Sequence, residues 1–320
     1  MQLLAALLAA GSAGAAELPS REVAFESGGY RLNGTLTLPG RLLGGVLIIP
    51  GSGPTDRNGT SRIAPSIPPA YRQWAERLGE GGFGALRFDK RSVTYPDIDF
   101  RSFDQEAQIA DAVSAVGFLR SVAELASKPI FIVGHSEGGT LAPMVAERSG
   151  AVAGVVVVNA VQFPVDELLL AQFEAMNVPP EQRDEVKRLF MQIKDGSFAK
   201  GGLLLGVGAA YWRQRIDYSS RSPATLSRLP MPLLLVQSLD DETLPRGTLA
   251  RNVALLRTVV PNKKSAQLSE LPGHDHFGML RGGREPSTEF MRILLDWLRS
   301  EARVTASPAR ADPSARGTRD

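Results

Sequence analysis

The stretch Ile130–Thr140 reads IFIVGHSEGGT, an apolar run followed by GHSEG at positions 134–138 and then by residues compatible with a helix. A Gly-x-Ser-x-Gly sequence between a strand and a helix is typical of a sharp turn that exposes the serine hydroxyl. Such a turn brings backbone against backbone, so we expect no room for a Cβ atom at Gly134 or Gly138. The stretch predicts that Ser136 is a nucleophile rather than a serine that caps a buried turn.

The first three expected strands lie between residues 21 and 50. Arg21–Pro39 alternates apolar and polar residues around Gly28-Gly29, which predicts a hairpin. Gly44–Pro50, GGVLIIP, is a continuous apolar run and predicts a central strand that is buried on both faces. The loop GSGPTDRNG at 51–59 follows the carboxyl end of that strand, where an α/β sheet directs backbone N–H groups toward a ligand. The alternative is a plain connecting loop.

The next segments alternate helix and strand. The apolar spacing predicts a helix over Pro69–Glu80, a strand over Ala85–Phe88 and a helix over Phe103–Ser121. The charged triplet Asp89-Lys90-Arg91 follows the strand. Charges at the end of a strand are more often a structural ion-pair cluster than a site, and we interpret the triplet in that way.

The alternation continues with a buried strand over Ala151–Val158 and then stops. From about residue 161 to 229 the pattern is helical, with helices expected over Val165–Met176, Pro180–Lys194 and Leu203–Arg215. This segment predicts a cap over the edge of the sheet where the Ser136 turn opens. Its large aromatic residues either line an acyl pocket or, as we favour, pack the cap onto the body; they are Phe173, Phe190, Tyr211 and Trp212.

The sheet is expected to resume at Pro232–Gln237, followed by a helix over Arg246–Val259, a strand over Ala266–Leu271 and a last helix over Pro286–Arg299. The sequence therefore predicts an α/β fold, a mostly parallel central sheet flanked by helices, with a helical cap inserted between strands six and seven. The expected divisions are a first part of the core at 17–160, the cap at 161–230, a second part of the core at 231–302 and a disordered, Ala-, Pro- and Arg-rich tail at 303–320.

Residues 1–16, MQLLAALLAAGSAGAA, resemble a secretory signal peptide, because an apolar run is followed by small residues. The run is too short to span a bilayer stably, so we expect a periplasmic or secreted protein without membrane insertion. The absence of cysteine excludes disulfides, thiolate catalysis and cysteine zinc sites. A net charge of +2, with scattered basic residues, gives no indication of a nucleic-acid partner.

A nucleophilic serine needs an imidazole to take its proton and a carboxylate to orient that imidazole. The chain holds three histidines. His135 adjoins the nucleophile but points away from it in a turn of this kind, so His274 and His276 are the candidate bases. Both follow the last expected strand, after the acidic residues Asp240 and Asp241, which agrees with the order serine, acid, histidine along the chain.

These motifs together resemble the α/β-hydrolase superfamily, close to the bacterial serine carboxylesterases, over about Val23 to Arg299. The resemblance rests on GHSEG at 134–138, PGSGPTDR at 50–57, FDKR at 88–91 and the segment 237–245. In this family the acid commonly stands four residues before a proline, as Asp241 does before Pro245, with Asp240 as the alternative. The base often follows a Pro-Gly pair by three positions, as His276 does, whereas His274 fits a rarer pattern.

The resemblance also implies an oxyanion hole, which needs two N–H donors aimed at the developing negative oxygen. It assigns them to the backbone of Glu137 and of Ser52 or Gly53. The sequence departs from the family pattern at Pro50, where a histidine is common, and at Ser92-Val93, where relatives tend to carry glycine.

The combined reading predicts a serine hydrolase that cleaves a small-molecule acyl ester through an acyl-enzyme, with Ser136, His276 and Asp241 as the catalytic residues and without a metal or organic cofactor. A serine peptidase, acyltransferase or thioesterase on the same fold is the alternative. A binding protein that has lost catalysis is a further alternative, which the complete set of serine, acid and histidine disfavours.

Overall fold

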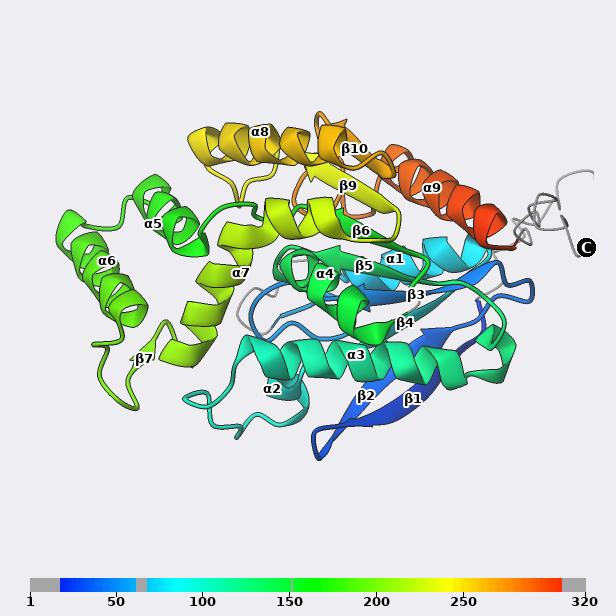
Figure 1. Cartoon of the computed structure of the whole chain (residues 1–320), viewed down its shortest axis with the longest axis horizontal. Helices are drawn as coiled ribbons and strands as arrows, with labels where there is room; N and C mark the ends of the chain where they lie inside the picture. Colours follow the sequence, from blue (N-terminus) through cyan, green and yellow to red (C-terminus); the bar gives the residue numbers. More distant parts are fainter. Residues whose placement is uncertain (1–17, 62–67, 151, 307–320) are drawn as a thin grey trace, which may run out of the picture.

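The computed structural model describes residues 18–61, 68–150 and 152–306. The expected signal peptide at 1–16 therefore lies outside the described residues, as does the expected tail from residue 307 onward. Within them, eight strands form one sheet in the order β1-β2-β4-β3-β5-β6-β9-β10 (Figure 1). The two pairings that involve β2 are antiparallel and the pairings from β4 to β10 are parallel.

The strands of this sheet are β1 (Ser20–Ser27), β2 (Tyr30–Thr37), β3 (Gly44–Ile49), β4 (Phe83–Phe88), β5 (Ile130–His135), β6 (Gly154–Val158), β9 (Leu233–Ser238) and β10 (Ala266–Leu271). The helices of the body are α1 (Ala70–Glu80), α2 (Arg91–Thr94), α3 (Gln105–Ser121), η1 (Ala123–Leu125), α4 (Glu137–Ser149), α8 (Arg246–Asn262) and α9 (Thr288–Ala306). The α/β architecture expected from the sequence is confirmed.

The sheet separates two hydrophobic cores, because successive side chains of a strand point to opposite faces. In β3, Val46 and Ile48 pack with residues of α1 and α9, whereas Leu47 and Ile49 pack with residues of α3, α4 and α8. All residues of β3, β4, β5, β6 and β9 are buried, as expected for strands covered on both faces. The helices thus form one layer on each side of the sheet.

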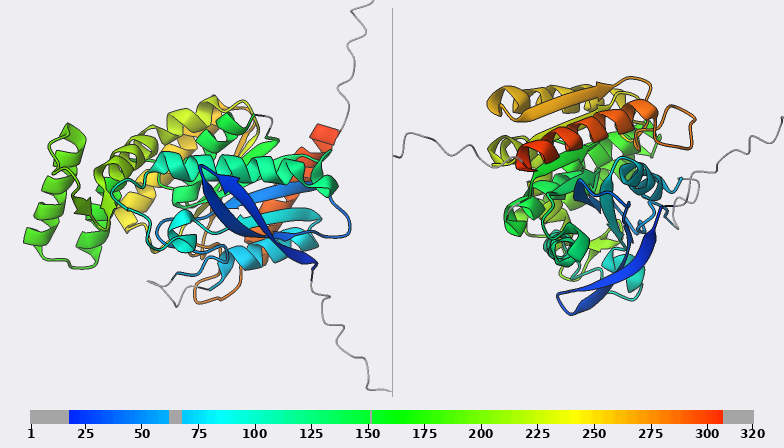
Figure 2. Two further views of the ribbon diagram at one scale, coloured as in Figure 1. Left: turned by 90° about the horizontal axis from the view of Figure 1, so that it is seen from below. Right: turned by 90° about the vertical axis from the view of Figure 1, so that its right-hand side faces the viewer.

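The cap lies between β6 and β9, the sixth and seventh strands of the sheet. It consists of α5 (Val165–Ala175), α6 (Pro180–Asp195), a short hairpin of β7 (Leu203–Leu204) and β8 (Val207–Gly208), and α7 (Ala209–Arg228). Figures 1 and 2 show α5 and α6 standing off one end of the body. Three of the aromatic residues singled out in the sequence, Phe190, Tyr211 and Trp212, are buried in a cluster that joins the cap to Phe103 of the body.

The structure corrects two of the expected helices. The helix expected from Leu203 begins only at Ala209, because Leu205 and Gly206 have φ angles of 48° and 83° and form the two-residue turn of the β7–β8 hairpin. The last helix runs to Ala306 instead of ending at Arg299, so the tail does not begin at residue 303. Ala302 packs into the core beneath α9, which explains why the helix continues.

The parallel strands bring the predicted site residues to one edge of the sheet. Loop 51–59 follows β3, Ser136 follows β5, Asp241 follows β9 and His276 follows β10. The carboxyl ends of parallel strands lie at the same edge, so four segments that are far apart in the sequence converge there.

Candidate active site

Ser136 occupies a strained turn between β5 and α4. Its φ of 54° and ψ of −121° lie outside the regions that residues with a side chain favour, and strain of this kind is typical of a nucleophile held at a strand-to-helix turn. A Cβ atom at Gly134 would lie 2.4 Å from the carbonyl oxygen of Gly138, and one at Gly138 would lie 2.3 Å from that of Ile49. The expectation that neither glycine has room for a side chain is confirmed.

His276 and Asp241 are in direct contact. Nδ1 of His276 donates to Oδ2 of Asp241 over 2.8 Å, and Oδ1 of Asp241 accepts from the backbone N–H and the hydroxyl of Thr243 at 2.9 and 2.7 Å. Both side chains are buried, at 8% and 2% residue exposure. The carboxylate thus fixes the orientation of the imidazole ring through Nδ1, and Nε2 is the ring nitrogen that can exchange a proton with another group.

Charge and burial act in opposite directions on this pair. Burial by itself lowers the pKa of His276, but the carboxylates of Asp241, Glu242 and Asp275 outweigh burial and leave this pKa above its ordinary value. Burial raises the pKa of Asp241, but His276 and the hydrogen bonds from Thr243 outweigh it and hold this pKa below its usual range. The carboxylate therefore stays ionised while the imidazole gains and loses a proton.

The alternative acid and base have other partners. Oδ2 of Asp240 accepts from the backbone N–H of Gly273 at 2.6 Å. His274 is buried and contacts the carbonyl of Pro272 at 2.7 Å and the hydroxyl of Ser287 at 2.6 Å. The geometry thus pairs His276 with Asp241. Asp240 and His274 instead form hydrogen bonds that stabilise the neighbouring loops.

His135 links the two loops that flank the nucleophile. The N–H of Gly51 donates to the hydroxyl of Tyr71 at 2.8 Å, that hydroxyl lies 2.7 Å from Nδ1 of His135, and Nε2 of His135 lies 2.8 Å from the carbonyl oxygen of His276. Because a carbonyl only accepts, Nε2 carries the proton and Nδ1 accepts from Tyr71. Burial, with a further contribution from His276, lowers the pKa of His135 to about 3, so the ring is neutral and unsuited to act as the base.

Asn159 supports the same carbonyl from the end of β6. Its Nδ2 donates to the oxygen of His276 at 2.7 Å, and its Oδ1 accepts from the backbone N–H of Ser238 at 2.7 Å. Asn159 has a φ of 49°, a conformation that asparagine tolerates better than most residues. The backbone of His276 is therefore held from β5 through His135 and from β6 through Asn159.

The loop after β3 lies against the nucleophile. A Cβ atom at Gly51 would lie 3.1 Å from Cβ of Ser136. Thr55 stabilises the loop by donating from its hydroxyl to the carbonyl of Ser52 at 2.8 Å and from its N–H to that of Gly53 at 2.9 Å. Within the described part of the chain the N–H groups of Ser52 and Gly53 donate no hydrogen bond. They are free to bind a ligand oxygen.

Glu137, the residue after the nucleophile, has a buried carboxylate. It accepts from Lys90 at 3.1 Å and from Nε2 of Gln105 at 2.8 Å, and it also accepts from the hydroxyl of Tyr211. Arg215 of α7 lies 3.6 Å away. Burial alone would raise the pKa of Glu137, but Lys90, Arg215 and the hydrogen bonds lower it to about 2. The carboxylate is therefore ionised at neutral pH.

The charged triplet at the end of β4 divides its contacts among three segments. Asp89 accepts from the side chain and backbone of Arg57 at 3.0 and 2.8 Å, and Arg91 pairs with Asp111 of α3 at 2.6 Å. Two of the three charges thus form the structural ion pairs expected from the sequence. Lys90 differs, because its ammonium group reaches Glu137 and the carbonyl of Gly51 beside the nucleophile.

A small cavity of about 30 Å³ brings these groups together at the junction of body and cap. Its wall includes Ser136 and His276 from the body and Arg215 from the cap. The apolar part of the wall consists of Val161, Val165, Leu168 and Leu244. The four aromatic residues considered for an acyl pocket are not in this wall. The three that are buried pack in the cluster that contains Phe103 of the body, in agreement with the favoured expectation that they pack the cap onto the body.

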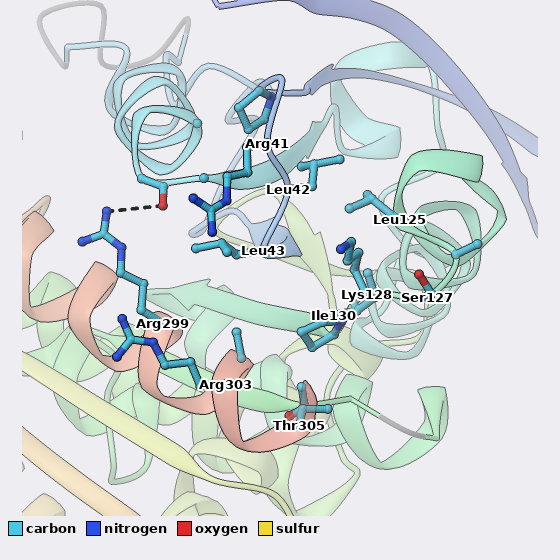
Figure 3. Close-up of a pocket in the computed structure, with 18 of the residues that line it drawn as sticks. Arg41, Leu42, Leu43, Leu125, Ser127, Lys128, Ile130, Arg299, Arg303 and Thr305 are labelled. Atoms are coloured by element: carbon cyan, nitrogen blue, oxygen red, sulfur yellow. Dashed lines mark hydrogen bonds between the residues drawn. The ribbon is translucent and has the colours of Figure 1, made fainter. Parts of the chain in front are cut away.

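A larger groove, of about 1080 Å³, lies elsewhere (Figure 3). It is lined by residues at the amino ends of the strands, including Ile130 at the start of β5, and by Arg41, Lys128 and Arg303. Arg299 on its wall donates to the carbonyl of Gly81 at 3.3 Å. Ligands of open α/β sheets bind at the carboxyl ends of the strands, so the smaller cavity at Ser136 is the better candidate site.

Sequence reasoning did not identify Tyr71, Asn159 or Arg215 as residues of the site. It assigned Lys90 to a structural ion-pair cluster and considered Tyr211 only for an acyl pocket or for packing of the cap. One signal was present: Glu137 places an acidic side chain in a turn that must be buried, and a buried carboxylate requires a cation or several donors. Lys90 and Arg215 meet that requirement, but nothing in their local sequence indicates it. Among residues 18–61, 68–150 and 152–306, no cluster of His, Asp and Glu is arranged to hold a metal ion. None of the helices there has the length and apolar character needed to cross a membrane.

The sequence is similar to that of known proteins. A profile of the Alpha/beta hydrolase family matches residues 46–290. A curated relative, the esterase EstD of Thermotoga maritima, is 29% identical over 229 residues, which make up 66% of this chain and 51% of that protein. The chain thus spans about half the length of the curated relative that it matches.

Solved structures share the fold at low sequence identity. The Pyrococcus furiosus esterase Pf2001 matches with a TM-score of 0.58 and 15% identity, over 89% of this chain and 92% of that one. The proline iminopeptidase of Mycobacterium smegmatis matches with a TM-score of 0.60 and 13% identity, over 89% and 99%. At these identities the similarity extends to the fold alone.

Proposed function

The chain belongs to the alpha/beta hydrolase family, and from this membership we propose that it is a carboxylesterase that cleaves small acyl esters with Ser136 as nucleophile. The observation that carries the proposal is the pairing of His276 with Asp241 at 2.8 Å in a cavity whose wall also holds Ser136 in its strained turn. The esterase EstD is a relative, which favours an ester over other acyl substrates.

In the proposed acylation step, Nε2 of His276 takes the proton of the Ser136 hydroxyl while Oγ of Ser136 bonds to the ester carbonyl carbon. The tetrahedral oxyanion accepts from the N–H of Glu137 and from that of Ser52 or Gly53. The ester C–O bond then breaks, and the alcohol leaves with the proton from His276. Ionised Asp241 keeps the ring oriented and stabilises its cationic form.

Deacylation repeats these steps with water as the nucleophile. His276 takes a proton from water, the hydroxyl adds to the acyl carbon, and the bond to Ser136 breaks as the serine regains its proton. The products are the carboxylic acid and the free enzyme. Every proton transfer in this scheme uses a group of the chain or water.

The test measures intact mass after incubation with a fluorophosphonate, together with hydrolysis of p-nitrophenyl acetate, butyrate and octanoate. We expect one covalent adduct on the native chain and none on Ser136→Ala. Ser219→Ala is the matched control, because Ser219 is another serine in the cavity wall, and it should keep the adduct. A folded native chain that gains no adduct and hydrolyses no ester would overturn the proposal.

A further inference from the structure

Two cations, buried Lys90 and largely buried Arg215, share the carboxylate of Glu137, and the proposed reaction steps use neither of them. Lys90 follows β4, Glu137 begins α4 and Arg215 lies on α7 of the cap. Lys90 and Arg215 lie 3.1 and 3.6 Å from the Glu137 carboxylate, with side-chain exposures of 8% and 15%. Burial lowers the pKa of Lys90. Burial also acts to lower the pKa of Arg215, but Tyr211 and Glu137 outweigh it and leave this pKa above its ordinary value, so Arg215 stays charged beside Glu137.

Each cation also holds a residue of the loop that follows β3. Nζ of Lys90 donates to the carbonyl of Gly51, and Nη2 of Arg215 donates to the hydroxyl of Ser52 at 2.6 Å. Gly51 and Ser52 are consecutive, and Ser52 or its neighbour Gly53 carries the proposed oxyanion donor. The Glu137 backbone carries the other donor. The two donors are therefore joined by one ionic cluster.

Arg215 is the member of this cluster that the cap contributes. Besides Ser52 and Glu137, its Nη1 donates to the hydroxyl of Tyr211 at 3.1 Å, and its guanidinium lies 5.6 Å from the ring of Trp212. These contacts within α7 hold the guanidinium beside Ser52. The guanidinium also forms part of the wall of the cavity that contains Ser136.

We propose that Arg215 is a positioning residue for the ester hydrolysis proposed above: by binding Ser52 and Glu137 together, it holds the two oxyanion donors at the spacing that the tetrahedral intermediate requires. The inference rests on the proposed function. It makes the activity depend on the seated cap, because a displaced α7 would withdraw Arg215 from the loop.

A purely structural role for Arg215 would have a different signature. Arg215→Gln leaves Lys90 and Glu137 as a one-to-one ion pair, so the buried carboxylate keeps a counter-ion. We therefore expect Arg215→Gln to remain folded with nearly the native Tm. A residue that only attached the cap to the body would affect Tm and KM, whereas a residue that positions the oxyanion donors affects kcat and the rate of phosphonylation at Ser136.

The experiment compares native protein with Arg215→Gln, Arg215→Lys, Ser52→Ala and the double variant Arg215→Gln/Ser52→Ala, using p-nitrophenyl butyrate. We expect Arg215→Gln to lower kcat about tenfold or more, with KM changed less than about threefold, and to slow fluorophosphonate labelling in parallel. Arg215→Lys should recover part of the loss, because it restores the charge. The double variant should be no slower than Arg215→Gln, since both changes break the same contact.

The matched control is Arg221→Gln, on the same helix, where Arg221 is exposed and pairs with Asp217. It should leave kcat, KM and labelling unchanged. Native kcat in Arg215→Gln, or fully additive losses in the double variant, would overturn the positioning role while leaving the esterase proposal intact. A native protein without hydrolysis or labelling would instead overturn the esterase proposal and this inference with it.

Discussion

Two adjacent carboxylates, Asp240 and Asp241, have different partners at the end of β9. Asp241 accepts from His276, whereas Asp240 accepts from the backbone of Gly273. We predict that Asp241→Asn lowers kcat by about 10³- to 10⁴-fold, because an amide no longer stabilises the cationic imidazole or fixes its tautomer. The measurement is kcat for p-nitrophenyl acetate, with circular dichroism to verify folding.

Asp240→Asn is the matched control for that change, since it makes the same replacement of a carboxylate by an amide at the neighbouring residue. It should retain most of the native kcat, because its oxygen can still accept from Gly273. Comparable losses in the two variants would contradict the assignment of Asp241 as the orienting acid.

The pH dependence of activity should reflect the carboxylates around His276. The base acts in its neutral form, and its raised pKa places the acid limb of kcat/KM above the ordinary histidine value. Glu242 is one of the groups that raise this pKa, so Glu242→Gln should move the limb to lower pH. Because Glu242 is exposed, we expect a shift of about 0.2 to 0.5 pH unit that diminishes with added salt.

The control for this shift is Glu270→Gln on β10, since Glu270 pairs with Arg257 and is not among the carboxylates that mainly raise the His276 pKa. Its acid limb should coincide with that of the native protein. The electrostatic explanation would be excluded if the acid limb of kcat/KM moved to higher pH in Glu242→Gln, or moved equally in both variants.

The sequence predicts individual residues of the site best where few residues of the chain could fill a given role. The chain has three histidines, and one of them, His135, lies inside the Ser136 turn. Order along the chain therefore leaves His274 and His276 as candidate bases. The final selection depends on the path of the loop, in which Asp275 accepts from the backbone N–H groups of Phe277 and Met279. The cations around Glu137 were not predicted, because they come from segments 47 and 78 residues away in sequence.

The Ser136 turn is the element whose sequence determines its geometry most strictly. A methyl group at Gly138 would lie 2.3 Å from a backbone oxygen of β3, which cannot move aside without shifting the strand. Gly138→Ala should therefore lower the free energy of unfolding by about 3 kcal/mol or more and impair Ser136 labelling. The measurement is urea denaturation followed by circular dichroism.

Gly117→Ala is the matched control, and we expect it to change the free energy of unfolding in the opposite direction. Gly117 lies in α3, is exposed, and has no atom within 4 Å of a Cβ placed on it. Alanine there should raise the free energy of unfolding by about 0.5 to 1 kcal/mol, because it favours the helix. If Gly138→Ala were as stable as Gly117→Ala, the turn would not have the tight packing described above.

Elements were predictable from sequence where burial alone determines them. The continuous apolar runs of β3, β5 and β9 identified these strands, because only strands covered on both faces combine such runs with short length. The β7–β8 hairpin was not predicted, because its turn needs a positive φ at Leu205, a conformation that leucine rarely adopts. Contacts far apart in the sequence hold the hairpin against the body, as the N–H of Gly208 donates to the carbonyl of Phe100 at 2.9 Å and Gly208 packs against the backbone of Arg101.

At the scale of the whole molecule, the site exists only where the body and the cap meet. To the cavity wall, the body supplies Ser136 and His276, while α5 and α7 supply Val165, Leu168 and Arg215. The order of strands and helices predicted both parts of the molecule. It did not predict the size of the space between them, which depends on how individual cap side chains pack.

That size leads to a prediction about substrates. A cavity of about 30 Å³ is far smaller than typical ligand pockets of several hundred cubic ångströms, so kcat/KM should fall from p-nitrophenyl acetate to octanoate. Leu168 of α5 is 9% exposed and forms part of the wall. Leu168→Ala should enlarge the cavity and raise the butyrate-to-acetate ratio of kcat/KM several-fold, at a cost of about 2 kcal/mol in stability.

Leu169→Ala separates this effect from general loosening of the cap, because Leu169 packs against the cap cluster and not in the cavity wall. It should lower stability without changing the butyrate-to-acetate ratio. If both variants changed the ratio equally, acyl selectivity would depend on cap mobility rather than on the wall. If neither did, the acyl group would bind away from Leu168, and the cavity volume would not determine which esters the protein accepts.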